Sequence, residues 1–295
     1  MKKRHVVLSA ALIAMLALSG CGGKDQQQQQ APKAMTADEI ITASNEAMND
    51  LDSYGFTMNL DMQMDMKEQG SMDMEMVSKA EAVLKPSVLI KMTSDITMNV
   101  PDQESQTVSM TQYIEGTDTG IAMYQEVAEG VWGKYTVDDP SLVEAMSQNP
   151  QDALESYKEV MEKAEILGEE KIGDRDCYKI EMTLTKEALD QIMAEFNGAG
   201  LDEKTLAASK EALSSAGGLS TVVWIDKENF QMLKQTMDIS DIIRQAMIAQ
   251  LKEAGVGEES IGDVTMSMEI LYDNYGGVSE IVIPDEAKNA QEITM

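Results

Sequence analysis

The amino-acid sequence predicts an α+β fold in which helices cover one face of a curved antiparallel sheet of about ten strands. Long stretches alternate apolar and polar residues with a period of two, which is typical of strands that bury one face. Turn residues interrupt these stretches at short intervals, which favours hairpins between neighbouring strands. Segments with helical periodicity are grouped at the start, in the middle and in a late segment.

The beginning of the chain has the layout of a secretory signal. Basic residues at positions 2–4 precede an apolar stretch, Val6–Leu18, which is too short to span a bilayer. The tetrapeptide Leu18-Ser19-Gly20-Cys21 resembles the lipobox of bacterial lipoproteins, in which the cysteine becomes the first mature residue and carries a diacylglyceryl thioether. We therefore expect residues 1–20 to be a signal peptide and Cys21 to be the lipidated anchor. The alternatives are an ordinary cleaved signal with an incidental cysteine, and a short core helix.

Residues 21–35 are rich in glutamine and lack apolar periodicity, so we expect them to form a flexible polar tether. No proline-rich or glycine-rich linker divides the chain after this point, and residues 36–295 are expected to fold as a single domain. The formal net charge of -29 argues against nucleic acid and anionic lipid headgroups as direct surface partners. Solubility is the simplest explanation of this charge.

The first ordered element is expected to be a helix from Ala37 to Leu51. Thr36 and Glu39 have the spacing of a capping box, in which each side chain bonds the backbone N–H of the other residue. An apolar stripe at helical spacing follows, so this helix should bury one face.

The stretch from Phe56 to Met76 is the one around which we expect the sheet to be organised. Its even-numbered positions are apolar and mostly methionine, while its odd-numbered positions are polar or acidic, which predicts strands. Lys67–Gly70 interrupts the alternation where a hairpin would turn. We call the even-numbered side the methionine face; at about 1.5 to 3 kcal/mol per buried Met, it must be covered by the chain itself or by a ligand. Its candidate cavity-lining residues are Met58, Met62, Met64, Met66, Met72, Met74, Met76 and Met92.

Three interpretations of the methionine face stay open. Flexible methionine side chains suit an apolar cavity that takes a lipid or another hydrophobic ligand. Methionines two residues apart on a strand also place thioethers where they can converge on Cu(I). Otherwise the face is core packing against helices of the same domain. The acidic residues on the other side match no twelve-residue calcium loop and are expected to form a solvated convex face; they are Asp61, Asp65, Asp73 and Glu75.

The later elements follow from the same signals. The even-numbered pattern continues to Leu84 and resumes from Val88 to Met98, so the region from Phe56 onward predicts a meander of four strands. Further strands are predicted at Thr107–Glu115, Ile121–Val127, Val131–Val137, Cys177–Leu184, Ser220–Asp226, Met232–Asp238, Asp263–Tyr272 and Val278–Ile283. Further helices are predicted after Pro140, from Pro150 to Ala164, after Thr185, at Lys204–Ser215 and at Ser240–Ala254.

Cysteine and histidine usage excludes several classes of enzyme. The single histidine, His5, leaves with the signal peptide, so the mature chain has no Ser-His-Asp or Cys-His site and no histidine-ligated zinc. Once Cys21 is acylated, Cys177 is the remaining thiol, and its strand position favours a quiet buried side chain over a redox site. We expect no catalytic residues, no metal site and no cofactor. Trp132 and Trp224 are expected to be buried strand residues rather than sugar-stacking platforms.

The order of these pieces resembles an uncharacterised family of Gram-positive surface lipoproteins. The Trp-Ile-Asp-Lys hairpin is similar to one in LolA-like and LppX-like lipoproteins, where a half-open antiparallel barrel wraps helices around an apolar cavity that takes acyl chains. The resemblance implies that residues 36–295 are a single LolA-like domain with helices packed on the concave face of the sheet. The methionine content and an insertion from Ser240 to Gly262 depart from those carriers. The motifs that carry the resemblance are Trp132-Gly133-Lys134, Gly173 with Tyr178, Trp224-Ile225-Asp226-Lys227 and Ile283-Pro284-Asp285-Glu286-Ala287.

These observations predict a lipoprotein that is anchored to the cell membrane through Cys21, faces outside the cytoplasm and is not an enzyme. It is expected to bind a lipid or another hydrophobic molecule in a cavity between sheet and helices. The alternative is an envelope interaction protein with a filled core, which uses its acidic face on a protein partner. Thioether binding of Cu(I) is the third hypothesis.

Overall fold

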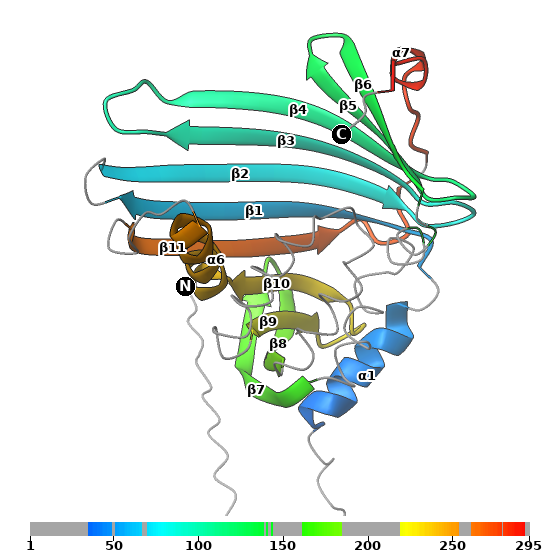
Figure 1. Ribbon diagram of the computed structural model, residues 1–295. Helices are drawn as coiled ribbons and strands as arrows, with labels where there is room; N and C mark the ends of the chain where they lie inside the picture. The colour runs from blue at the N-terminus through cyan, green and yellow to red at the C-terminus, as the bar shows by residue number, and fades with distance from the viewer. Residues whose placement is uncertain are drawn as a thin grey trace, which may run out of the picture. The chain divides into compact units, whose positions relative to one another are not determined.

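The computed structural model describes residues 35–48, 51–66, 70–138, 140, 143, 161–184, 219–253, 261–278 and 280–292. Its strands form an 11-stranded sheet with the order β6-β5-β4-β3-β2-β1-β11-β10-β9-β8-β7 (Figure 1). Neighbouring strands are antiparallel throughout. The curved sheet is open, because β6 and β7 lie at its opposite edges and do not pair with each other. The predicted α+β fold class is confirmed. The strands are β1 (Ser53–Met66), β2 (Gly70–Val83), β3 (Leu89–Asn99), β4 (Gln106–Gly116), β5 (Ile121–Ala128), β6 (Val131–Val137), β7 (Met161–Ile172), β8 (Arg175–Leu184), β9 (Leu219–Asp226), β10 (Met232–Asp238) and β11 (Ile261–Asp273).

The strands β1 and β2 form a long hairpin at the centre of the sheet. Each has 14 residues, because the period-two alternation runs unbroken through both segments. The alternation between Phe56 and Met98 predicts four strands, and this number is wrong. The region forms the three strands β1, β2 and β3, since the even-numbered pattern from Met72 to Ala82 belongs to one continuous strand.

The helix α1 (Ala37–Met48) begins with the predicted capping box. The backbone N–H of Thr36 donates to Glu39 Oε2 at 2.8 Å, and the backbone N–H of Glu39 donates to Thr36 Oγ1 at 3.2 Å. Two groups that the helix leaves without intrahelical partners are thereby satisfied. Ile40 and Ile41 are fully buried and pack in a core cluster that includes Ile180 of β8 and residues of β9.

The helix α6 (Ser240–Glu253) packs on the same face of the sheet. Ile248, together with Ile243 and Met247, contacts Met64 of β1 and Val264 of β11. The helices α1 and α6 cover the same face of the sheet. Residues that are paired across β1, β11, β10, β9 and β8 have their side chains on one side, and this row connects the residues under α6 with those under α1. The expected packing of helices on the concave face is confirmed, and the predicted helix at Ser240–Ala254 is confirmed as α6.

One predicted helix was wrong at its end. Met161 and Ala164, assigned above to a helix that begins at Pro150, lie in the edge strand β7. Register shifts at Met161/Lys163 and at Ile166/Gly168 break the period-two alternation, so a bulged strand was mistaken for a helix. The part of this helix before Met161 and the predicted helices after Thr185 and at Lys204–Ser215 lie outside the described residues. Of the helix predicted after Asp139, only Pro140 and Val143 are described, and both are helical.

The predicted strand Val278–Ile283 is also wrong. The described residues of this segment make no ladder; Ile281 and Ile283 pack against Tyr113 and Tyr124, on the side of the sheet away from α1 and α6. The short helix α7 (Asp285–Lys288) follows Pro284 and buries Ala287 in the same cluster. Alternating apolar residues here reflect one-sided packing rather than strand pairing.

Candidate ligand-binding face

The register of four neighbouring strands gathers methionines into one row across the sheet. Met62 on β1 lies opposite both Met74 on β2 and Met266 on β11. Met74 in turn lies opposite Met98 on β3. We call these four residues the methionine row. Directly opposed residues have Cβ atoms about 4.5 to 5.5 Å apart, so their side chains are neighbours.

The rows on either side of the methionine row are largely apolar too. Their members are Met64 with Met72 and Val264, then Leu60 with Met76, Met268 and Ile96, then Met58 with Ile270 and Ser78. Met92 lies opposite Ala80 on the same face. The structure therefore brings seven of the eight candidate methionines onto one face of β1, β2 and β3. Met66 belongs to β1, but its side chain lies outside the described part of the structure.

Coverage of this face is uneven. Met64 is 7% exposed because α6 packs over it. Met58, Met62, Met74, Met76 and Met92 are half-buried. Further along the face, Met98 on β3 is 38% exposed and Val108 on β4 is 53% exposed.

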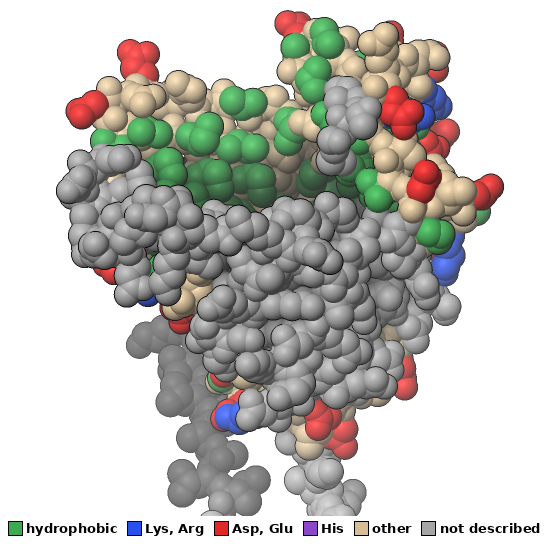
Figure 2. Space-filling view, in the orientation of Figure 1, with side chains coloured by type: hydrophobic (Ala, Val, Ile, Leu, Met, Phe, Trp, Pro, Cys, Tyr) green, Lys and Arg blue, Asp and Glu red, His purple; other side chains and the backbone are tan. Residues whose placement is uncertain are grey.

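The uncovered part of the face can be followed in the space-filling view. Figure 2 shows hydrophobic side chains gathered along the sheet over the strands that Figure 1 labels β2 to β4. A buried polar pair lies within this surface: the hydroxyls of Ser78 on β2 and Ser94 on β3 are hydrogen-bonded at 2.7 Å. The methionine face is thus closed by α6 at one end and accessible at the other.

The opposite side of the sheet carries a groove of about 620 Å³. The acidic residues at odd-numbered positions predict a solvated convex face here. Asp61 and Glu75 are exposed as predicted, but they line a hollow, because the twisted sheet brings β8 to β10 round toward β1 and β2. The carboxylates that line the groove are those of Asp61, Glu75, Glu181, Asp238 and Glu269.

Several of these acids already have partners. Glu269 forms an ion pair with Lys234, and Asp238 accepts hydrogen bonds from the hydroxyl and the backbone N–H of Ser240, which hold the pKa of its carboxyl below the usual value. Among the described residues, no three His, Cys, Asp or Glu side chains are arranged to hold a metal ion. The groove is acidic, and the carboxylates of Glu269 and Asp238 already interact with other groups of the domain.

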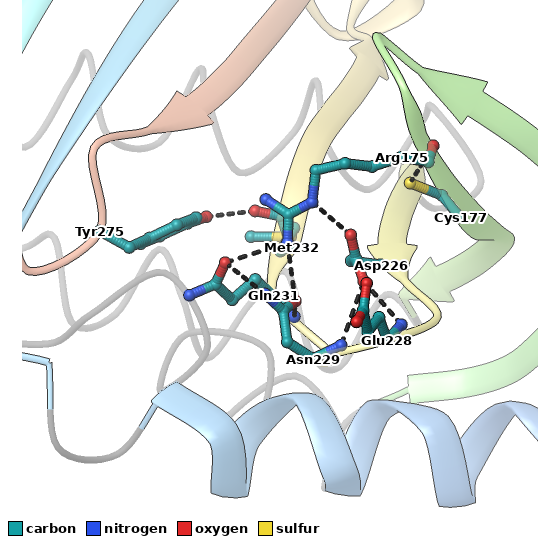
Figure 3. A network of polar contacts seen from close by, with 8 residues as sticks. All are labelled: Arg175, Cys177, Asp226, Glu228, Asn229, Gln231, Met232 and Tyr275. Carbon is teal, nitrogen blue, oxygen red and sulfur yellow. Dashed lines mark hydrogen bonds and ion pairs between the residues drawn. The ribbon is translucent and has the colours of Figure 1, made fainter.

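A polar network that sequence reasoning did not identify closes the β9–β10 turn (Figure 3). Arg175 donates to the carboxylate of Asp226, which is 3% exposed, and to Asn229 Oδ1 at 2.7 Å. Asp226 Oδ1 also accepts the backbone N–H of Glu228 at 2.6 Å and that of Asn229 at 3.1 Å. Asp226 belongs to the Trp-Ile-Asp-Lys motif quoted above, and its role here is to hold a turn. The motif flagged Asp226, but no local signal pointed to Arg175, 51 residues earlier.

The two tryptophans differ in their surroundings. Trp224 is buried as predicted, and Lys179 and Lys234 lie over its ring at 5.0 Å and 4.9 Å from the centroid. Trp132 is half-buried and packs against Tyr113, with 5.8 Å between ring centroids. Cys177 is fully buried, and burial raises the pKa of its thiol, as expected for a quiet side chain. None of these three side chains forms an open site.

In the part of the chain that the structure describes, no helix is both long and apolar enough to cross a membrane. Comparison with curated proteins finds no match. Similar solved structures include LprF from Mycobacterium bovis, at 15% identity over 85% of this chain and 97% of that chain with a TM-score of 0.43. They also include the lipoprotein LppX from Mycobacterium tuberculosis, at 10% identity over 82% of this chain and 96% of that chain with a TM-score of 0.36. A LolA-superfamily protein from Nitrosomonas europaea matches at 12% identity over 86% of this chain and 97% of that chain with a TM-score of 0.20.

A family model described as a family of unknown function, DUF6612, matches residues 36–292. The prediction of an uncharacterised family is thereby confirmed. The chain belongs to the DUF6612 family.

Proposed function

We propose that this protein is a membrane-anchored extracytoplasmic lipoprotein that binds a hydrophobic ligand against its methionine face. The observation that carries the proposal is the uneven coverage of that face: α6 packs over Met64, while Met58, Met62, Met74, Met76 and Met92 stay half-buried. Contiguous apolar surface that a domain leaves accessible is characteristic of a binding site.

Methionine suits such a site because its unbranched side chain adapts to ligands of irregular shape. A lipid chain laid along β1 to β3 would remove apolar area of both partners from water, at about 0.8 kcal/mol per buried methylene. The ligand cavity is proposed to lie between this face and the helices. Binding rather than catalysis is the proposed activity, since Cys177 is buried and the sole histidine lies at position 5.

The proposed anchor is Cys21, which would carry a diacylglyceryl group and a further acyl chain such as palmitate. Two or more chains hold a protein on a membrane where one does not. Residues 1–20 are the proposed signal peptide and residues 21–35 the proposed tether, so residues 36–295 would work outside the cytoplasm at the cell surface.

Native mass spectrometry of the full chain carrying Cys21→Ser tests the ligand proposal, because this variant lacks the proposed lipidation site and keeps the other residues. We expect adducts of lipid mass that are recovered by organic extraction. Met92→Trp should remove them by filling the open part of the face. Thr93→Trp is the matched control, because Thr93 is exposed on the other side of the same strand. Met64→Trp is unsuitable, since it would displace α6.

A protein that stays free of adducts after incubation with membrane lipids would overturn the proposal. That result would favour the second candidate, an envelope interaction protein that uses the acidic groove on a protein partner. The observation that supports an interaction protein is the groove of about 620 Å³, which is lined by Asp61, Glu75 and Glu181 among others.

A further inference from the structure

We propose that the methionine row, Met62, Met74, Met98 and Met266, is a Cu(I) site in which the thioethers of Met62 and Met74 bind the ion together with that of Met98 or Met266. The residues are placed by the register of β11, β1, β2 and β3. The site is a separate proposal from the hydrophobic ligand, with which it shares Met62 and Met74 on the same face of the sheet.

The residue type is the first argument. Strands ordinarily fill an apolar face with β-branched and aromatic residues, which fit a pleated surface well. This chain instead has 25 Met against 3 Phe, and the row consists of methionine on four adjacent strands. Burial of apolar area alone does not require sulfur, since Val, Ile or Leu bury a comparable area. Sulfur is therefore what distinguishes this row.

The geometry is the second argument. Adjacent strands lie about 4.8 Å apart, and the row spans consecutive strands with no register shift between its members. A methionine has three rotatable side-chain bonds, so neighbouring sulfurs can lean toward one point between the strands. The concave curvature of the face brings side-chain tips closer together than the backbones that carry them.

The third argument is that solvent reaches the methionine row, whereas the neighbouring row that contains Met64 and Met72 is covered by α6. Met64 and the adjacent Met72 pack against α6, so their surroundings are filled. Met62, Met74 and Met266 are half-buried, and Met98 is 38% exposed. An ion can reach the row from solvent at β3 and lose its water on the way to Met62.

The donor set selects the ion. Thioethers are soft ligands that favour Cu(I), whereas carboxylates and carbonyls favour hard cations. The strand alternation places Asp61, Asp73 and Glu75 on the other side of the sheet, so the row offers sulfur without nearby hard donors from β1 and β2. Thioethers need no deprotonation, and Cu(I) affinity should therefore stay constant as the pH falls, unlike that of a carboxylate, imidazole or thiolate site.

The test is an anaerobic competition titration of Cu(I) between a chromophoric chelator and the full chain carrying Cys21→Ser. We expect saturable binding that is unchanged between about pH 5 and pH 8. The double variant Met62→Leu with Met74→Leu should weaken binding by about tenfold or more. Leucine keeps apolar volume, so the fold should persist.

The matched control is Met58→Leu with Met92→Leu, which removes two sulfurs from the same face outside the row and should leave Cu(I) affinity unchanged. Equal loss in the two double variants, no loss in the row variant, or an affinity that falls steeply with acid would each overturn the site. Adduct retention is read by native mass spectrometry in the Cys21→Ser chain that carries no further substitution. Failure of Cu(I) binding with adducts retained rejects this site alone, while loss of adducts with Cu(I) binding retained rejects the hydrophobic-ligand proposal alone.

Discussion

The guanidinium of Arg175 donates to the buried carboxylate of Asp226, joining the start of β8 to the end of β9. Asp226→Ala should lower the free energy of unfolding by about 2 kcal/mol, because the change removes an ion-pair partner and leaves two turn N–H groups without their acceptor. Urea denaturation measures this change. The control is Asp176→Ala, which breaks a surface pair with Lys171 and should cost less than about 1 kcal/mol. Equal costs would mean that the Arg175 network contributes no more than a surface pair.

The carboxylate of Asp226 should make the free energy of unfolding depend on pH in the acidic range. Burial alone would raise the pKa of Asp226, but the N–H groups of Asn229 and Glu228 and the Arg175 guanidinium outweigh burial and lower the pKa. A lowered folded-state pKa stabilises the fold above the unfolded value of about 3.9, and this stabilisation is lost as the pH falls through the folded-state pKa. Denaturation midpoints measured from neutral pH to about pH 2 should fall less steeply in Asp226→Asn than in the native chain. Parallel profiles would contradict the assignment.

At alkaline pH, the buried Tyr54 should make the free energy of unfolding depend on pH. Burial raises the pKa of Tyr54 to about 12. Because the unfolded value is about 10, the folded state is favoured below that pH and loses stability as the pH rises from about 10 toward 12. Spectroscopic titration of the phenolates should therefore show ionisation of Tyr54 only near or above unfolding. Tyr54→Phe should reduce the alkaline loss of stability, and a phenolate at Tyr54 in the folded chain near pH 10 would refute the prediction.

The buried serine pair on the methionine face gives a double-mutant test. Ser78→Ala or Ser94→Ala alone should cost about 1 to 2 kcal/mol, because one buried hydroxyl is left without the other. The double variant should cost less than the sum of the two, since no hydroxyl remains unsatisfied. Thermal or urea unfolding of the four proteins checks this coupling. Strict additivity would show that each hydroxyl finds another partner.

The capping box of α1 should stabilise the domain measurably. Thr36→Ala removes the side-chain acceptor for the Glu39 N–H and should cost about 1 kcal/mol, whereas Thr36→Ser keeps the acceptor and should cost little. Urea denaturation of both variants is the measurement. A serine variant as unstable as the alanine variant would assign the cost to the lost methyl group instead.

Strong local periodicity was the most reliable guide to the fold. The alternation through β1 and β2 and the capping box before α1 each predicted an element correctly, because the determining residues are neighbours in the chain. The edge strand β7 was missed because its bulges break the alternation. The segment Val278–Ile283 was assigned to a strand because one-sided packing against Tyr113 and Tyr124 imitates strand periodicity. Both errors arose where the local pattern is not specific to one structure.

The sequence by itself determined which residues share a face, because side chains alternate along a strand whatever that strand pairs with. It therefore predicted that Met62 and Met74 lie on one side and Asp61 and Asp73 on the other. Only the tertiary structure decided that Met266, about 200 residues later, lies opposite Met62, and that α6 packs over Met64 while Met98 stays accessible. Pairing between distant strands depends on packing across the whole sheet, and no local pattern records it. The same reason explains Arg175, whose partner Asp226 is a neighbour only after β8 and β9 have paired.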